Sequence, residues 1–279
     1  VYDAVAQIPG STAARKLLVD KSLEYLAALE RDAQDSLALK RDLGVAWERL
    51  GDVQGAYLDP SLGDTRQALD HYRRSLAIRE ALVREAPTLP HRLDLLRVQV
   101  ILGEALQAAD LDAEARTVLE AGIRNAEVVA AESSSAVDLR KVAAVYMVYG
   151  TAEWTARRFE PGLAWLERAR TTFQQIAATA PQDRTARRDV AVVAGRIGLV
   201  HMRGTGRYEE GLVHYRQAYD TLDALAREVP GNAEVQRARV YSRASVGQLL
   251  VLLRRPAEAL RELEPELAQL DAWRRADAA

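Results

Sequence analysis

The 279-residue sequence contains no cysteine, and phenylalanine and methionine occur only twice each. The absence of cysteine excludes disulfides, thiol catalysis and zinc sites with thiolate ligands. Long apolar runs are also missing, since the longest are VAAVYMVY at 142–149 and LLVLL at 249–253. A membrane-spanning helix needs about 20 apolar residues. The sequence therefore predicts no direct insertion of this segment into a membrane.

An excess of charge of one sign is lacking too. Lysine and arginine total 38 and aspartate and glutamate total 40, so the formal net charge is −2. Such a balance gives no global attraction to nucleic acid, and we expect no nucleic-acid partner. The hydrophobic content of 48% is enough for a large core. The N-terminus shows no signal-peptide pattern. Because the sequence begins with Val1 and lacks an initiator methionine, we expect it to be a fragment of a longer protein.

What the sequence does contain is amphipathic helix almost throughout. Alanine, leucine, arginine and glutamate dominate, and apolar residues recur at three- and four-residue spacing, as in LLVDKSLEYLAAL at 17–29. Prolines and glycines interrupt this pattern and leave later segments of roughly 45 to 50 residues. The regular interval predicts an all-α chain built from internal repeats.

Five glycines, which we call the register glycines, mark the repeats: Gly51, Gly103, Gly150, Gly198 and Gly247. After each comes a small residue and, four positions later, a bulky one: Ala68 with Tyr72, Ala115 with Leu119, Gly162 with Leu166, Gly211 with Tyr215, and Ala259 with Leu263. The glycine precedes the small residue by 17, 12, 12, 13 and 12 positions in the five copies. A helical glycine costs about 1 kcal/mol relative to alanine, so its return indicates a close crossing of two antiparallel helices.

This arrangement resembles the tetratricopeptide repeat (TPR), whose pattern is W-x2-L-G-x2-Y, then A-x3-F, then a closing proline. Trp47, Leu50 and Gly51 match the opening, although the tryptophan does not recur and the period exceeds 34 residues. The resemblance implies an all-α fold: a right-handed superhelical α-solenoid of antiparallel helix pairs with long helices. We expect N-terminal capping helices in residues 1–35 and five TPR-like pairs in 36–279, forming one continuous solenoid.

A narrower resemblance lies in the N-terminal third. The strings IPGSTAARKLLVDKSLEYLAALERDA, LGDVQG and LGDTRQALDHYRRSLAIREAL are similar to the segment that follows the catalytic domain in bacterial serine/threonine protein kinases with C-terminal TPRs. This resemblance implies a C-terminal regulatory or sensory part of such a kinase. Attachment through a membrane span would place it outside the cytoplasm; otherwise the location would be cytoplasmic.

No constellation of residues predicts catalysis, a cofactor or a metal. HRLDLL at 91–96 has an extra leucine relative to a kinase catalytic loop, and no Asp-Phe-Gly follows it. GTGRYEEG at 204–211 lacks the Gly-Lys-Ser/Thr ending of a phosphate loop and is interpreted as the turn within a helix pair. His201 and His214 can approach one another across that pair, but no metal-ligand spacing accompanies them.

In such arrays the first helix of each pair lines a concave groove that binds extended peptides or helices. Candidate groove positions lie three before, one after and four after each register glycine. They are Glu48, Asp52, Gly55, Val100, Glu104, Gln107, Met147, Thr151, Trp154, Gly195, Leu199, Met202, Ala244, Gln248 and Val251. An acidic N-terminal end and an apolar middle predict a hydrophobic ligand segment with basic residues toward one end. The alternative is that Trp154 and Met202 pack between repeats.

The leading hypothesis is therefore a non-catalytic scaffold that binds a protein or peptide partner. The alternative is a module that senses a small ligand and signals to an attached catalytic domain. Within the stretch at 47–72, about five extra residues surround YLDPSLGD. Asp64 is expected to cap the following helix, and Asp59 and Asp64 together could form a partner-binding loop. The sequence does not define the oligomeric state.

Overall fold

The computed structural model describes residues 36–55 and 63–264, together with Lys21, Leu23, Glu24, Leu26, Leu29 and Glu30. Asp59 and most of the predicted capping helices in 1–35 lie outside the described residues. The chain forms two compact units, Val1–Ala152 and Glu153–Ala279, whose boundary falls near the end of one helix. Each unit is described by itself.

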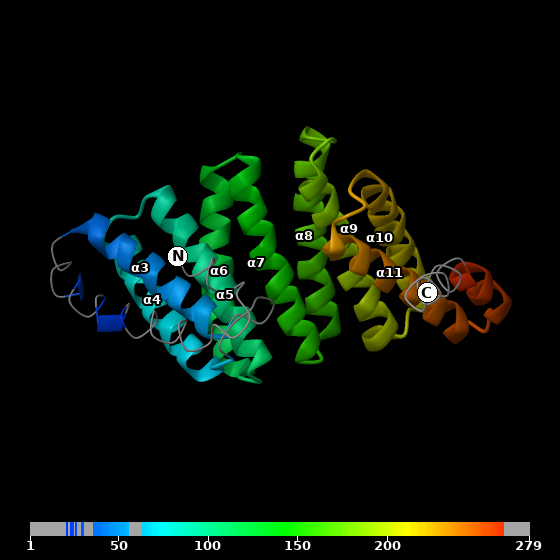
Figure 1. The fold of residues 1–279 in the computed structure, drawn as a ribbon, viewed down its shortest axis with the longest axis horizontal. Helices are drawn as coiled ribbons and strands as arrows, with labels where there is room; N and C mark the ends of the chain where they lie inside the picture. The colour runs from blue at the N-terminus through cyan, green and yellow to red at the C-terminus, as the bar shows by residue number, and fades with distance from the viewer. Residues whose placement is uncertain are drawn as a thin grey trace, which may run out of the picture. The chain divides into compact units, whose positions relative to one another are not determined.

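The described elements are helices that follow one another in consecutive pairs (Figure 1). The first helices of the pairs are α3 (Leu37–Gly55), α5 (Leu89–Ala108), α7 (Ala136–Thr155), α9 (Arg184–Val200) and α11 (Ala233–Leu252). The second helices are α4 (Thr65–Glu85), α6 (Asp112–Glu132), α8 (Phe159–Thr179) and α10 (Tyr208–Glu228). Residues 256–264 form the described part of the helix that follows α11. The all-α architecture of paired helices predicted from the sequence is confirmed.

Long helices account for the long repeat period. The second helices each contain 21 residues, and α5, α7 and α11 contain 20. Among the described residues, no helix combines the length and the apolar character required to cross a membrane.

Side-chain caps define several helix starts. Asp64 precedes α4 and accepts a hydrogen bond from the Gln67 backbone N–H at 3.0 Å, as expected from the sequence. Asn232 caps α11 in the same way through the Val235 N–H, also at 3.0 Å. Pro161 lies in the first turn of α8, where a missing N–H breaks no helical hydrogen bond.

The register glycines lie where the two helices of a pair approach most closely. A Cβ atom added to Gly103 would lie 2.5 Å from the Leu119 side chain, and one on Gly198 would lie 2.7 Å from the Tyr215 ring. Gly51 against Tyr72 and Gly247 against Leu263 repeat this contact at 2.3 Å and 2.7 Å. Gly150 and Leu166 fall in different units. In the other four copies the glycine and its bulky partner lie in the same unit, and these four contacts confirm the register deduced from the sequence.

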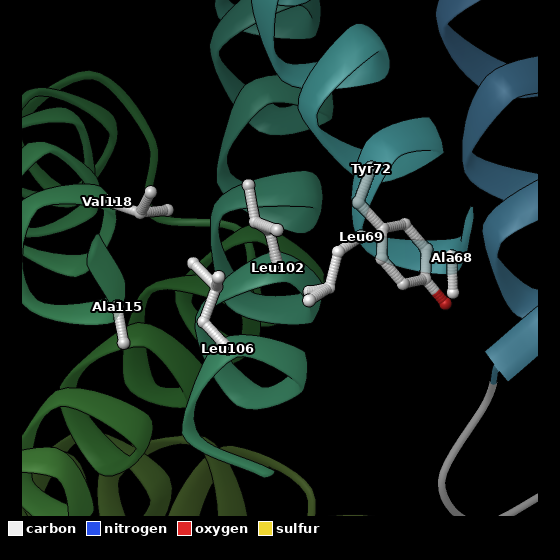
Figure 2. Packing of buried hydrophobic residues seen from close by; sticks show 7 residues of the cluster. All are labelled: Ala68, Leu69, Tyr72, Leu102, Leu106, Ala115 and Val118. Carbon is white, nitrogen blue, oxygen red and sulfur yellow. The ribbon is translucent and has the colours of Figure 1, made fainter. Parts of the chain in front are cut away.

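Each unit buries apolar side chains from successive helices. In the first unit, Leu69 of α4 points toward Leu102 and Leu106 of α5, as Figure 2 shows. The same cluster includes Ala115 and Val118 of α6. Burying such side chains stabilises the fold by about 1.5–3 kcal/mol each, so the pairs are held together through a shared core rather than through their turns.

Candidate functional site: the first-helix face

We define the first-helix face as the fifteen groove positions predicted from the register glycines. Thirteen of them are at least partly accessible to solvent, among them Asp52, Glu104, Gln107, Met147 and Thr151 of the first unit. In the second unit Trp154 and Leu199 are half-buried, and Gln248 is exposed. Glu48 and Met202 are the two buried members.

Glu48 lies in a buried ion-pair cluster that joins three helices. Its carboxylate is 2.6 Å from Arg79 Nη2 of α4 and 2.5 Å from Arg97 Nε of α5. The side chains of Glu48 and Arg79 are each only 3% exposed. Burial raises the pKa of the Glu48 carboxyl, and the two guanidinium groups oppose that rise. Glu48 therefore stabilises the packing of α3 against α4 and α5 and offers no free negative charge to a ligand.

The other two acidic groups at this end differ in environment. Asp52 accepts a hydrogen bond of 2.9 Å from the Tyr72 hydroxyl, beside the register contact of the first pair. Burial, and then the negative charge of Asp52, raise the pKa of the Tyr72 hydroxyl, so it stays a protonated donor. Glu104 is exposed on α5. The negative charge predicted for this end is therefore smaller than the sequence alone implied.

The second unit presents the apolar part of the face. Leu199 of α9 packs on a buried cluster that contains Met202, Tyr215 of α10 and Leu249 of α11. Gly195 lies near the fully buried Tyr215 ring, and a Cβ added there would make only an ordinary contact with it at 3.9 Å. Met202 is 5% exposed and belongs to this core, as the alternative interpretation held.

Along α11 the face becomes a continuous exposed stripe. Five exposed members follow one another at three- and four-residue spacing: Arg237, Tyr241, Ala244, Gln248 and Val251. Leu252, four residues after Gln248, is exposed on the same side. The large apolar members keep much of their surface in solvent, with Tyr241 52%, Val251 56% and Leu252 42% exposed. Tyr241 and Leu252 were not among the predicted positions, although extending the same helical spacing from Gly247 would have included them.

His201 and His214 lie close together, as predicted from the sequence. The rings of His201 and His214 stack with centroids 5.7 Å apart and planes 15° from parallel. His201 Nδ1 is 3.2 Å from the Thr205 hydroxyl, and its Nε2 is 3.6 Å from a Glu210 carboxylate oxygen. Within the described ranges 36–55 and 63–264, no group of three or more histidine or carboxylate side chains is arranged to hold a metal ion.

The remaining motif candidates have structural roles. Residues 204–211 span the turn of the α9–α10 pair and the first turn of α10, with Gly206 in the left-handed region at φ 70°. His91, in the first turn of α5, is 2.8 Å from the Ala86 carbonyl oxygen through Nδ1. Asp94 pairs with Arg41 of α3 at 2.6 Å, which connects two pairs in the first unit.

Comparison with known proteins supports the fold. No family model and no curated protein sequence matches the chain. Among solved structures, BtubC (BKLC) from P. vanneervenii is similar, with a TM-score of 0.71 and 15% identity over 94% of this chain and 92% of that one. A kinesin light chain of nearly identical TPR-like repeats from P. anserina has a TM-score of 0.52 and 17% identity, over 85% of this chain and 96% of that one.

A third similar structure is a signal transduction ATPase with numerous domains that carries a tetratricopeptide repeat sensor, from Pyrococcus horikoshii. Its TM-score is 0.51 at 11% identity, and the match covers 99% of this chain but 40% of that one. Identities this low establish the fold alone. Together with the repeated glycine contacts, these likenesses show that the chain has a TPR-like all-α fold.

Proposed function

We propose that the chain is a non-catalytic scaffold whose first-helix face binds a segment of a protein partner. The exposed stripe of α11 carries this proposal, because it presents large apolar side chains in register along one helix face. Contiguous exposed apolar surface is typical of interaction sites. A hydrophobic or amphipathic helix, or an extended peptide with apolar side chains, is the partner class that such a surface recognises.

Charge defines the partner further. Because Glu48 is neutralised by Arg79 and Arg97, the strongly basic end proposed for the ligand is not required. The formal net charge of −2 gives no general attraction to nucleic acid, so we propose a protein partner and no nucleic acid.

The test compares two faces of one unit. The double variant Gln248→Asp and Val251→Asp places charges on the α11 stripe, whereas Val213→Asp places one on α10 at a residue that is 54% exposed. Proteins captured by the wild-type chain from cell extract are identified, and the affinity of the purified partner is measured by calorimetry. We expect at least about tenfold weaker binding for the double variant, since an apolar anchor is worth more than 1.4 kcal/mol. For Val213→Asp we expect the affinity to stay unchanged.

Equal binding by all three proteins, with unchanged melting curves, would remove the first-helix face from the function. A parallel Trp154→Ala variant tests how far the binding surface extends toward the start of the second unit. Loss of binding there with an intact fold would include Trp154 in the surface.

We also propose that the chain is the C-terminal regulatory part of a bacterial serine/threonine kinase. The three strings in the N-terminal third support this context. The neighbouring coding sequence tests it: a kinase domain upstream of Val1 would support the proposal, and an unrelated domain would reject it.

Small-ligand sensing is a second candidate, favoured by the structural similarity to the Pyrococcus horikoshii protein, which carries a tetratricopeptide repeat sensor. Such a role requires a ligand that stabilises the isolated chain. Thermal-shift screening against metabolites separates the two candidates, because a ligand at 100 times its Kd would add about 2.7 kcal/mol of stability.

A further inference from the structure

The α9–α10 pair contains a feature that the other described pairs lack. Its small residue Gly211 follows Gly198 by 13 positions, whereas the corresponding interval in the α5–α6 pair is 12. The extra residue is accommodated by η1, a five-residue π-helix at His201–Thr205. A π-turn is the usual structural result of one inserted residue, and such turns often occur at functional sites.

The π-turn connects the first-helix face to a neighbouring helix. Gly204 lies against the Phe159 ring at the start of α8, where an added Cβ would be 2.8 Å from the ring. Met202, in the same turn, belongs to the cluster on which Leu199 packs. A change in this turn therefore reaches both α8 and the apolar part of the first-helix face.

The histidine stack lies at the start of this turn. His201 is 5% exposed. His214 is half-buried on α10, and its Nδ1 is buried without a hydrogen-bond partner in the described part of the chain. Two neutral imidazoles can stack in this way, but a proton on either would put a charge against its neighbour and into a poorly solvated site.

Charged groups of three elements surround the stack. α8 contributes Glu160, Glu167 and Arg170, the turn before α10 contributes Arg207, and α10 contributes Glu210. Burial lowers the pKa of the His201 imidazole; Glu210 opposes that effect and Arg207 adds to it. Burial also lowers the pKa of the His214 imidazole, with Glu167 opposing. The carboxylates thus reduce the free-energy cost of protonating the buried imidazoles, but burial still outweighs them.

We propose that the His201–His214 stack and its π-turn form a proton-operated switch that loosens the end of α9 under mildly acidic conditions and weakens partner binding by the second unit. The effect on binding rests on the proposed function, whereas the loosening does not. Since both imidazoles titrate lower in the folded than in the unfolded chain, the folded turn is fully stable above the unfolded histidine pKa of about 6.5 and loses stability as pH falls below it.

The first test uses the wild-type chain alone. NMR titration of the four histidines between pH 7.5 and 5 reports protonation, and the Phe159 ring resonances and amide exchange of 199–206 report the turn. We expect both imidazoles to titrate below about 6.5. Exchange at 199–206, corrected for its intrinsic pH dependence, should become about tenfold faster per pH unit of acidification in that range. An ordinary midpoint for both imidazoles, or unchanged exchange, would overturn the switch.

Variants assign the response. His214→Gln removes one titrating group at a half-buried site, and we expect it to cut the acid-induced acceleration at 199–206 at least threefold. His71→Gln is the matched control, because His71 is also buried and has its pKa lowered mainly by burial, but lies in the first unit against Trp47. An equal response in the wild type and His214→Gln would reject the assignment to the stack.

The binding arm uses the partner captured by the wild-type chain. We expect its affinity to fall between pH 7.5 and 5.5 for the wild type and to fall less for His214→Gln. If the turn loosens but affinity does not change, the link to binding is wrong while the switch stands. If the first-helix variants bind normally at pH 7.5, the proposed function fails independently.

Discussion

The α5–α6 pair and the α9–α10 pair make the same glycine contact between their helices but have turns of different length. In both, a register glycine lies under a bulky side chain, Gly103 under Leu119 and Gly198 under Tyr215. The first pair closes through Asp110 in the left-handed region at φ 57°, seven residues after its glycine. The second pair contains a π-turn and has its left-handed residue, Gly206 at φ 70°, eight residues after its glycine.

The difference shows that helix contact, and not turn length, fixes the geometry of a pair. An extra residue is absorbed in the turn while the glycine contact is kept. The contact is kept at the expense of the turn because burial contributes more to stability. Displacing Leu119 or Tyr215 from the core would cost several kcal/mol, whereas a π-turn loses a few helical hydrogen bonds worth about 1 kcal/mol each.

We expect the greatest loss of stability when the bulky side chain of the glycine contact is removed. Leu119→Ala removes a fully buried side chain, and we expect it to lower the free energy of unfolding by about 3 kcal/mol. Leu260→Ala is the matched control, since Leu260 is 68% exposed. Denaturant unfolding followed by circular dichroism measures both. A loss below 1 kcal/mol for Leu119→Ala would mean that this contact does not hold the pair.

The next effect breaks the contact from the glycine side. Gly103→Ala should destabilise by about 1–2 kcal/mol, because overpacking outweighs the better helix propensity of alanine. In the Leu119→Ala background the same change should become neutral or stabilising, since the clashing atoms are gone. A double-mutant cycle measures this coupling, and additive effects would contradict the close crossing.

Exchanging the two turn residues tests whether each turn requires its left-handed residue. Gly206→Asp should cost about 1 kcal/mol, because a side chain at positive φ is strained, and Asp110→Gly should gain less than that. Gly231→Ala serves as the control, as nothing lies within 4 Å of its added Cβ. Thermal unfolding detects the shifts; a stabilising Gly206→Asp would show that the left-handed turn is not required.

The smallest effect has the opposite sign. Gly195 lies on α9, three residues before Gly198, but its added Cβ meets no atom closer than 3.9 Å. We expect Gly195→Ala to stabilise by up to about 1 kcal/mol, while Gly198→Ala destabilises. Two glycines one turn apart would thus respond in opposite directions, and a loss of stability in both would contradict the register.

Much of the fold was predictable because it depends on local spacing. The register glycines, the cap by Asp64 and the place of Pro161 follow from residue types at fixed intervals. The burial of Glu48 was not predictable, because it requires Arg79 and Arg97 from two other helices. No spacing along α3 encodes that meeting.

The burial of Met202 was predicted only as the alternative to a place in the groove. The equivalent positions Gln107, Trp154 and Val251 are accessible, whereas Met202 is buried in the π-turn. One inserted residue rotates the helix phase, so a position counted with α-helical spacing no longer falls on the same face. The interval of 13 instead of 12 was the signal.

Site-specific photocrosslinking shows directly whether partners bind the first-helix face. A benzophenone amino acid at position 248 on α11 is compared with one at position 213 on α10, both being exposed sites of one unit. We expect the partner to crosslink from position 248 and at least tenfold less from position 213, because the label reacts only within contact distance. Equal crosslinking, or crosslinking from position 213 alone, would contradict it.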